Sequence, residues 1–139
     1  MLADRIGAVL AIDPAAPAIE LDGRWTSWGD LAQVAAEVQR LVSQSGVAAP
    51  AAVAVLLRNH PLIIGASLGV LEGEGCIVTI NPHQGDAGLT GDLRDLRPPI
   101  VVAAEEDWRR AGLLEAVEEM GSVAIAVGIA DGRPAAWVL

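Results

Sequence analysis

The sequence has no lysine, no phenylalanine and no tyrosine, and it has a single cysteine, Cys76. Without lysine, the chain cannot form a Schiff base, use a lysine general base or complete a lysine-containing phosphate loop. Because tryptophan is the only aromatic residue type, we do not expect an aromatic platform that stacks single-stranded nucleic acid. A lone cysteine excludes an internal disulfide and a metal site built from several cysteines.

Basic charge is also scarce, since 9 arginines stand against 18 acidic residues and the formal net charge is −9. Nucleic acids and anionic membranes bind basic surfaces, so the composition argues against both as partners. The longest apolar run, Leu62 to Leu71, is half the roughly 20 residues that a membrane helix needs. Asp4 lies where a signal peptide carries only positive charge. We therefore expect no signal peptide, no transmembrane segment and a reduced, cytoplasmic setting.

The chain does contain enough apolar material for one folded domain. Its 139 residues are 53% hydrophobic, and the mean hydropathy is +0.44. A chain of this length typically forms a single domain with a sizeable core. The sequence shows no linker, repeat or low-complexity segment, so we interpret residues 1–139 as one domain. The high hydropathy predicts an uncovered apolar face that drives self-association.

Short strands and helices alternate along this domain. Asp22-Gly23 predicts a tight β-hairpin near the amino terminus, because glycine readily adopts a positive φ angle. The remaining pattern predicts helices at 3–12, 27–46, 62–73, 89–96 and 105–120, and strands at 53–57, 76–80, 100–103, 122–127 and up to 139. The expected fold class is α/β, with a mostly parallel mixed β-sheet flanked by helices and a short amino-terminal hairpin.

Several side chains have expected structural roles within these elements. Ser27 and Asp30 have the spacing of a capping box at the start of a helix. Trp25 and Trp28 are expected to pin the hairpin to the core. Pro134 should confine the last strand to an edge of the sheet, because proline has no N–H to donate to a neighbouring strand.

The central segment allows both functional and structural interpretations. Gly65, Gly69 and Gly73 fall on one face of a predicted helix, where they permit a helix contact across a dimer or tight packing of the helix on the sheet. We favour packing on the sheet. Cys76 has no histidine or other base near it in the sequence, and it lies in a strand predicted to be buried. We therefore favour a core thiol over a nucleophile.

Four polar residues are candidates for contacts with a cleft or an interface. Arg58, Asn59 and His60 follow one predicted strand, and His83 follows the next. The carboxyl ends of parallel strands meet at one edge of a sheet, where ligands commonly bind. The alternative, which we favour, is a solvated turn that caps the following helix. Neither histidine has a carboxylate or cysteine at ligand spacing, so we expect no metal site and assign no catalytic residue.

An acidic run, Glu105 to Asp107, is expected to open the helix predicted at 105–120. Negative charge in a first helical turn is favourable by roughly 0.3–1 kcal/mol per residue, because it complements the helix dipole. That effect explains the run without a functional role. Further along this helix, Leu113, Leu114, Val117 and Met120 should face the core.

Four segments follow one another in an order that is typical of one enzyme family. They are AIELDGRWTSWGDLAQVAAEVQRL, VAVLLRNHP, LIIGASLGVLEGEGCIVTINP and DLRDLRPPIVVA, which together run from about Ala18 to Ala104. In this order and with these turns, the chain resembles the amino-terminal subdomain of AMP-forming acyl-CoA synthetases, within the adenylate-forming superfamily. It departs from the family pattern at residues 49–52, where relatives usually carry a Gly-Asp-type turn.

The resemblance implies a two-step reaction in the complete enzyme. A carboxylate attacks ATP to give an acyl-adenylate and pyrophosphate, and the thiol of CoA then displaces AMP to give a thioester. The family uses a Ser/Thr/Gly-rich phosphate loop, an acidic residue on the ribose and a lid lysine, none of which this sequence contains. Its glycine-rich candidate, Gly85 to Gly91, lacks lysine and carries Asp86. The resemblance thus implies ATP, Mg²⁺ and CoA for the parent enzyme and no cofactor bound by this segment.

Three hypotheses remain open from the sequence. The first is an amino-terminal part of a fatty-acid or acyl-CoA ligase, inactive alone, whose partner is the remainder of the parent ligase. The second is a non-catalytic interaction protein that kept the scaffold and binds itself or another synthetase chain. The third is a small nucleotide-binding α/β domain. The reading frame beyond Leu139 distinguishes the first two, and ATP calorimetry tests the third.

Overall fold

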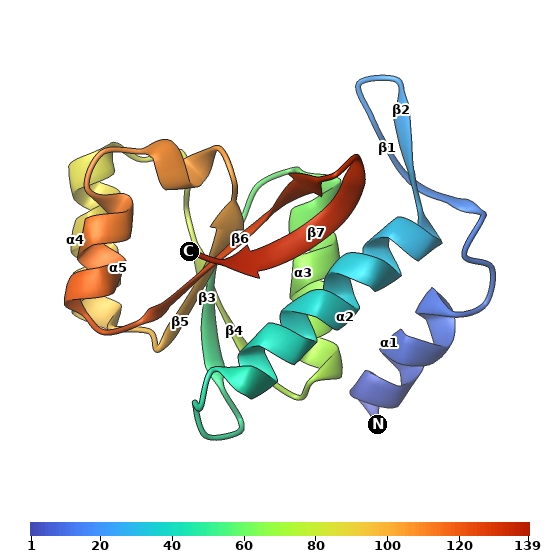
Figure 1. Ribbon diagram of the computed structural model, residues 1–139, viewed down its shortest axis with the longest axis horizontal. Coiled ribbons are helices and arrows are strands. Elements are labelled where there is room, and N and C mark those ends of the chain that lie inside the picture. Colours follow the sequence, from blue (N-terminus) through green and yellow to red (C-terminus); the bar gives the residue numbers. More distant parts are fainter.

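A computed structural model describes all 139 residues, from Met1 to Leu139. Its centre is a five-stranded sheet in the order β4-β3-β5-β6-β7, in which β7 alone runs antiparallel to its neighbour (Figure 1). The strands are β3 (Ala52–Leu56), β4 (Cys76–Ile80), β5 (Ile100–Ala104), β6 (Val123–Ala130) and β7 (Arg133–Val138). The predicted α/β class with a mixed, mostly parallel sheet is confirmed.

Helices cover both faces of this sheet. α2 (Trp28–Gln44) and α3 (Pro61–Glu72) pack on one face, α4 (Asp86–Leu96) and α5 (Leu113–Glu119) pack on the other, and α1 (Leu2–Leu10) lies against α2 and α3 (Figure 1). Valine and isoleucine from β3, β5 and β6 face the first pair of helices, whereas alanine from the same strands forms much of the surface beneath the second pair. This alternation suits a sheet that is buried on both sides.

The amino-terminal hairpin lies outside the main sheet. β1 (Pro17–Leu21) pairs with β2 (Arg24–Ser27), and both residues of the Asp22-Gly23 turn have positive φ angles, as a type I′ turn requires. At the start of α2, the Asp30 N–H donates to Ser27 Oγ at 3.1 Å and the Ser27 N–H donates to Asp30 Oδ2 at 3.3 Å. The predicted turn and capping box are both confirmed.

The expectation that Trp25 pins the hairpin to the core is wrong. Trp25 is 64% exposed on β2, because no other element covers that side of the two-stranded ribbon. Trp28, at the start of α2, is half-buried against a small apolar cluster that includes Leu10 and Leu31. Ala18 and Ile19 of β1 pack against the same cluster, so the hairpin is attached through its first strand, and the side that carries Trp25 faces solvent.

The helix predicted at 105–120 is broken into two pieces. A short 3₁₀ turn, η1 (Asp107–Arg109), is separated from α5 by Gly112, whose φ of 76° lies in the left-handed region. No long helix therefore begins at the acidic run, and the expected interaction of its charges with a helix dipole does not occur. Asp107 instead turns inward and is 1% exposed.

The glycines of α3 make their close contact with α2, which differs from both interpretations given above. A Cβ added at Gly69 would clash with the carbonyl of Ala35, and one added at Gly65 would lie 3.2 Å from the carbonyl oxygen of Leu31. The small residues therefore bring two helices of the same chain together. They neither pack α3 tightly on the sheet nor face a second copy.

β4 is an edge strand, so the prediction that Cys76 is a core thiol is wrong. Only β3 pairs with β4, and Cys76 is exposed. The uncharged sequence of β4 suits a central strand equally well, so the sequence pattern did not reveal that β4 lies at the edge of the sheet. The last residue of β4, Ile80, is the one that is fully buried.

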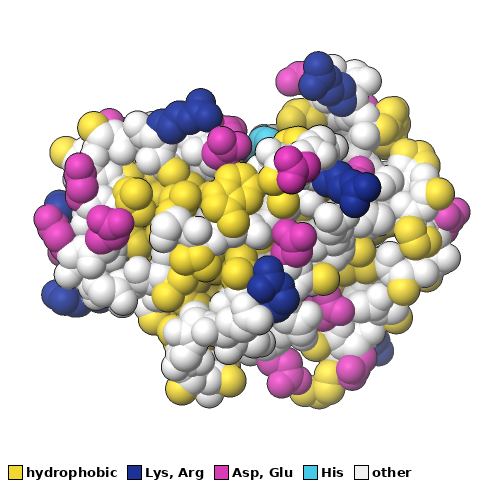
Figure 2. All heavy atoms as spheres, in the orientation of Figure 1, with side chains coloured by type: hydrophobic (Ala, Val, Ile, Leu, Met, Phe, Trp, Pro, Cys, Tyr) yellow, Lys and Arg dark blue, Asp and Glu magenta, His cyan; other side chains and the backbone are white.

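Apolar side chains also reach the surface elsewhere. Figure 2 shows a band of them across the middle of the face that carries β6 and β7, between α5 and α2. Near the chain ends, the exposed large apolar side chains include Leu2, Ile12, Val138 and Leu139. No helix combines the length and the hydropathy needed to cross a membrane.

Candidate functional site

The turns that follow β3, β4 and β5 lie close together, because these strands are parallel neighbours and end on the same side of the sheet. We call this side, where the strands have their carboxyl ends, the carboxyl edge of the sheet. Arg58, Asn59 and His60 form the first turn, and His83 lies in the second. The structure therefore brings the predicted residues to a common edge. Each can contact a ligand only through polar groups that are not already bonded within the chain.

Arg58 forms a bidentate ion pair with Asp107. Its Nε donates to Asp107 Oδ2 at 2.6 Å and its Nη2 donates to Oδ1 at 2.7 Å. The carboxylate is 1% exposed and the arginine side chain 30% exposed. Hydrogen bonding to this carboxylate raises the pKa of Arg58 above its ordinary value, although partial burial acts in the opposite direction. Arg58 therefore ties the turn after β3 to the turn after β5.

Arg110 extends this network to the turn after β4. Its Nε donates to Asp86 Oδ1 at 2.8 Å, and its Nη1 and Nη2 donate to the carbonyl oxygens of Pro82 and Gln84, each at 2.6 Å. Its Nη1 also lies 3.9 Å from Asp107 Oδ1. Two arginines thus connect three turns through five hydrogen bonds to groups of the same chain.

The other predicted residues have different surroundings. His60 is the N-cap of α3, where its Nδ1 accepts a hydrogen bond from the Leu62 N–H at 3.2 Å. This matches the capping alternative, and it means that neutral His60 carries its proton on Nε2. Asn59 and His83 are exposed, and the His83 N–H donates to Asn81 Oδ1 within its own turn. Of the four predicted residues, His60 alone lines the cleft described next.

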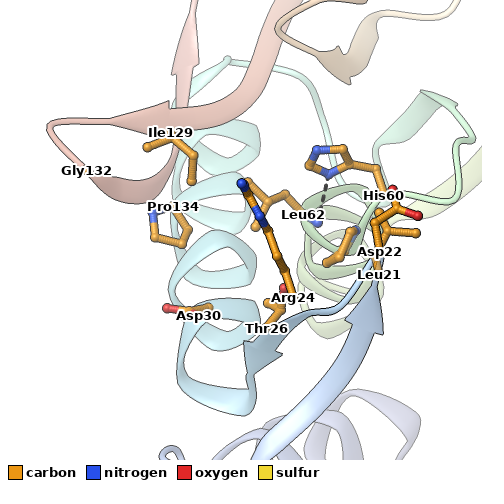
Figure 3. Close-up of a pocket in the computed structure, with 11 residues that line it drawn as sticks. Leu21, Asp22, Arg24, Thr26, Asp30, His60, Leu62, Ile129, Gly132 and Pro134 are labelled. Carbon is orange, nitrogen blue, oxygen red and sulfur yellow. Dashed lines mark hydrogen bonds between the residues drawn. The ribbon is translucent and has the colours of Figure 1, made fainter.

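This cleft lies between the two hairpins and has a volume of about 750 Å³. Its walls come from the β1–β2 hairpin, the start of α2, the start of α3 and the β6–β7 hairpin. In Figure 3, the Arg24 side chain extends from β2 into the cleft, with Ile129 and Pro134 on one side and His60 on the other. The lining residues are Leu21, Asp22, Arg24, Thr26, Asp30, His60, Pro61, Leu62, Ile129, Gly132 and Pro134.

Arg24 is the cationic group of the cleft, and none of the ion pairs in the chain involves it. The starts of α2 and α3 lie beside Arg24, but they offer few free N–H donors to an anion, because their first N–H groups are already bonded. The Trp28 and Gly29 N–H groups donate to backbone carbonyls of the preceding loop, and the Leu62 N–H donates to His60. An acidic group entering the cleft would therefore be bound by side chains and not by a helix terminus.

The residues present do not fit nucleotide phosphates or a magnesium ion. The glycine-rich stretch from Gly85 to Gly91 forms the N-cap and first turns of α4, so it is not a loop that could wrap around phosphate. Asp86 in its first turn is paired with Arg110 and would repel an anion. No group of three or more His, Cys, Asp or Glu side chains is placed to hold a metal ion.

A second hollow, of about 370 Å³, lies under α1 and is almost entirely apolar. Ile6, Ile19, Trp28 and Leu68 contribute to its walls, and Arg5 is its only charged residue. It offers no set of polar groups that could orient a reacting molecule. We therefore regard the cleft between the hairpins as the better candidate for binding.

Sequence reasoning missed three residues of these sites: Arg24, Asp107 and Arg110. Arg24 lies beside a turn whose sequence indicates only a hairpin. Asp107 follows two exposed or half-exposed glutamates, and nothing in the run marks the third position as buried. Arg110 acts through carbonyl groups that are 26 and 28 residues away in the chain, which leaves no local pattern.

The sequence of this chain matches a known family over nearly its whole length. The family described as AMP-binding enzyme matches residues 8–137. No curated protein sequence matches the chain.

Solved structures, among them two CoA ligases, share the fold. ATP-bound MatB from Rhodopseudomonas palustris superposes with a TM-score of 0.68 and 22% identity, over 94% of this chain and 26% of that chain. A benzoate CoA ligase from Burkholderia xenovorans LB400 gives 0.72 and 18%, over 96% and 26%. The anthranilate CoA ligase AuaEII, in complex with anthranoyl-AMP, gives 0.66 and 14%, over 98% and 33%. The chain spans about a quarter to a third of the length of these three proteins.

Proposed function

Because the chain belongs to the family of AMP-binding enzymes, we propose that it is the amino-terminal scaffold of an acyl- or aryl-CoA ligase. The observation that carries the proposal is the family match over residues 8–137, joined to a fold that covers nearly all of this chain but only about a quarter of MatB. Residues 1–139 would then form one subdomain of a larger enzyme.

The complete enzyme would activate a carboxylic acid, such as a fatty acid, with ATP and Mg²⁺ and then transfer the acyl group to CoA. ATP would supply the leaving group, Mg²⁺ would stabilise the charge and CoA would supply the acceptor thiol. No set of residues in this chain fits the phosphates or the metal ion, so we derive no chemical step through them. The proposed partner of the chain is the remainder of the ligase, in the cytoplasm.

The contribution of this chain would be structural. The Arg58–Asp107 pair and the Arg110 contacts fix three consecutive turns at the carboxyl edge of the sheet. A fixed edge can hold a neighbouring domain at a constant distance and angle, which is what a reaction across a domain interface requires. The cleft with Arg24 and His60 opens beside that edge and would face the rest of the enzyme or its substrate.

The test is acid-dependent exchange of pyrophosphate into ATP, measured with a panel of fatty and aromatic acids. We expect no exchange by the 139-residue chain alone and exchange when the polypeptide that continues its reading frame is added. The Arg58→Met variant lacks the ion pair that connects two of the turns, so with the added polypeptide it should give less exchange than wild type. Exchange by the chain alone, or a stop codon after Leu139 without a separately encoded remainder, would contradict the proposal.

A further inference from the structure

The start of α3 depends on a single side chain to bond one of its first N–H groups. Pro61 is the first residue of the helix and has no N–H. The N–H groups of Ile63 and Ile64 donate to the backbone carbonyl oxygen of His60 at 3.0 and 3.2 Å. The Leu62 N–H has no backbone partner and donates to His60 Nδ1 at 3.2 Å. Leu62 is 5% exposed, so water has little access to this N–H when the imidazole cannot accept.

Protonation of His60 removes this acceptor, because a histidinium ion carries a hydrogen on both ring nitrogens. Two donors, Nδ1 and the Leu62 N–H, would then face each other, and a buried N–H without a partner destabilises the fold. The positive charge would also lie at the amino end of α3, where the helix dipole disfavours cations. The first turn of α3 contains no acidic residue that offsets this effect. Both effects destabilise the start of α3 when His60 is protonated.

Charged side chains on the neighbouring elements surround this histidine. They are Asp22 and Arg24 on the β1–β2 hairpin, Asp30 on α2, Arg58 in the same turn, and Glu106 and Asp107 beside Arg58. The residues of the β6–β7 hairpin that line the cleft carry no charge. No ion pair or hydrogen bond joins any of these charged side chains to the imidazole. The bond to the Leu62 N–H is therefore the only hydrogen bond of the ring that a proton would break.

We propose that His60 is a pH-dependent cap of α3 that controls one wall of the cleft. The neutral ring joins the turn after β3 to the first turn of α3, whose Pro61 and Leu62 line the cleft. Protonation breaks the cap, loosens this wall and adds a second positive charge to the cleft beside Arg24. The wall is thus fixed at neutral pH and loosened in mild acid. Every group involved lies within residues 1–139, so the switch can be tested whether or not the ligase proposal is correct.

The test compares urea unfolding of wild type and His60→Asn at several pH values between about 8 and 5, the range in which histidine gains a proton. Asparagine caps helices well and does not titrate, and all other groups are the same in the two proteins. The folding constant of wild type, divided by that of His60→Asn, should fall about fivefold from the highest to the lowest pH. That is the factor typically produced by loss of a helix cap, and its sign follows from weaker proton binding by the folded chain.

The second histidine provides a matched control. His83 is exposed, and its side chain caps no helix. His83→Asn should therefore keep the pH dependence of wild type. If His83→Asn abolishes it, His60 is not the titrating group and the proposal is wrong.

Amide hydrogen exchange, followed by NMR, reports the local event. Exchange at the Leu62 N–H, relative to His60→Asn at the same pH, should accelerate about fivefold in acid because the cap is lost. Exchange at Val102, in the central strand β5, should keep a constant ratio between the two proteins. A folding-constant ratio that does not change with pH would overturn the proposal, as would Leu62 exchange that changes equally in both proteins.

Discussion

The carboxyl edge of the sheet and the cleft between the hairpins adjoin at His60, yet they use polar side chains in opposite ways. At the edge, Arg58 and Arg110 bond to Asp107, Asp86 and backbone carbonyls of the same chain. In the cleft, Arg24 has no such partner. Polar residues after parallel strands therefore indicate a ligand site only if their groups remain unbonded, and at this edge they build the scaffold.

The largest effect is expected for Arg58→Met. This change leaves the buried Asp107 carboxylate with only Arg110, whose nearest nitrogen is 3.9 Å away. An uncompensated buried charge should lower the free energy of unfolding by about 3–5 kcal/mol, measured by urea denaturation. The matched control is Arg58→Met combined with Asp107→Leu, which removes both charges and should recover most of the loss. A single variant as stable as wild type would show that the edge is not held by this pair.

A smaller loss, about 1–3 kcal/mol, is expected for Asp107→Ala. The Arg58 side chain that remains is 30% exposed and can turn to water. Its unpaired charge should therefore destabilise the fold less than the buried carboxylate left by Arg58→Met. Thermal unfolding of Asp107→Ala and Asp86→Ala in parallel provides the comparison, because the Asp86 side chain is 47% exposed. Equal losses in the two variants would argue against a special role for the buried carboxylate.

His60→Ala should cost about 1 kcal/mol, because α3 loses its N-cap acceptor. His60→Asn should recover most of that loss, since asparagine is a good N-cap residue. The free energies of unfolding of these two variants distinguish capping from a purely binding role. If both are as stable as wild type, His60 belongs to the cleft alone.

The smallest effect on stability is expected for Arg24→Gln, within about 0.5 kcal/mol of wild type. Arg24 forms no ion pair in the chain, so its removal leaves no buried group without a partner. A clear loss of stability in this variant would remove the distinction between edge and cleft. Denaturation in urea, side by side with Arg58→Met, gives the direct contrast.

Much of the fold follows from local sequence patterns. The Asp22-Gly23 turn, the capping box of Ser27 and Asp30, and the proline at the start of α3 each have short-range physical causes that the sequence shows. The parallel direction of the first four strands of the sheet also follows, because apolar runs separated by helices favour parallel strands. The sequence did not show that Gly112 would break the helix predicted at 105–120, since glycine is tolerated inside helices when packing requires it.

The candidate site was less predictable. The sequence placed Arg58, Asn59, His60 and His83 at one edge of the sheet, and the structure brings them there. The sequence could not show that Arg58 forms an ion pair with Asp107, because the two residues are 49 positions apart and the carboxylate is buried only by the packing of η1. The exposure of Cys76 had the same cause, since strand order in space decides which strand is an edge.

The central claim is that these residues provide a scaffold and not a nucleotide site. Titration calorimetry of ATP with Mg²⁺ into the folded 139-residue chain tests it most directly. The account predicts no saturable heat, with wild type and Arg24→Gln indistinguishable. Saturable binding of ATP by the chain alone would contradict the account.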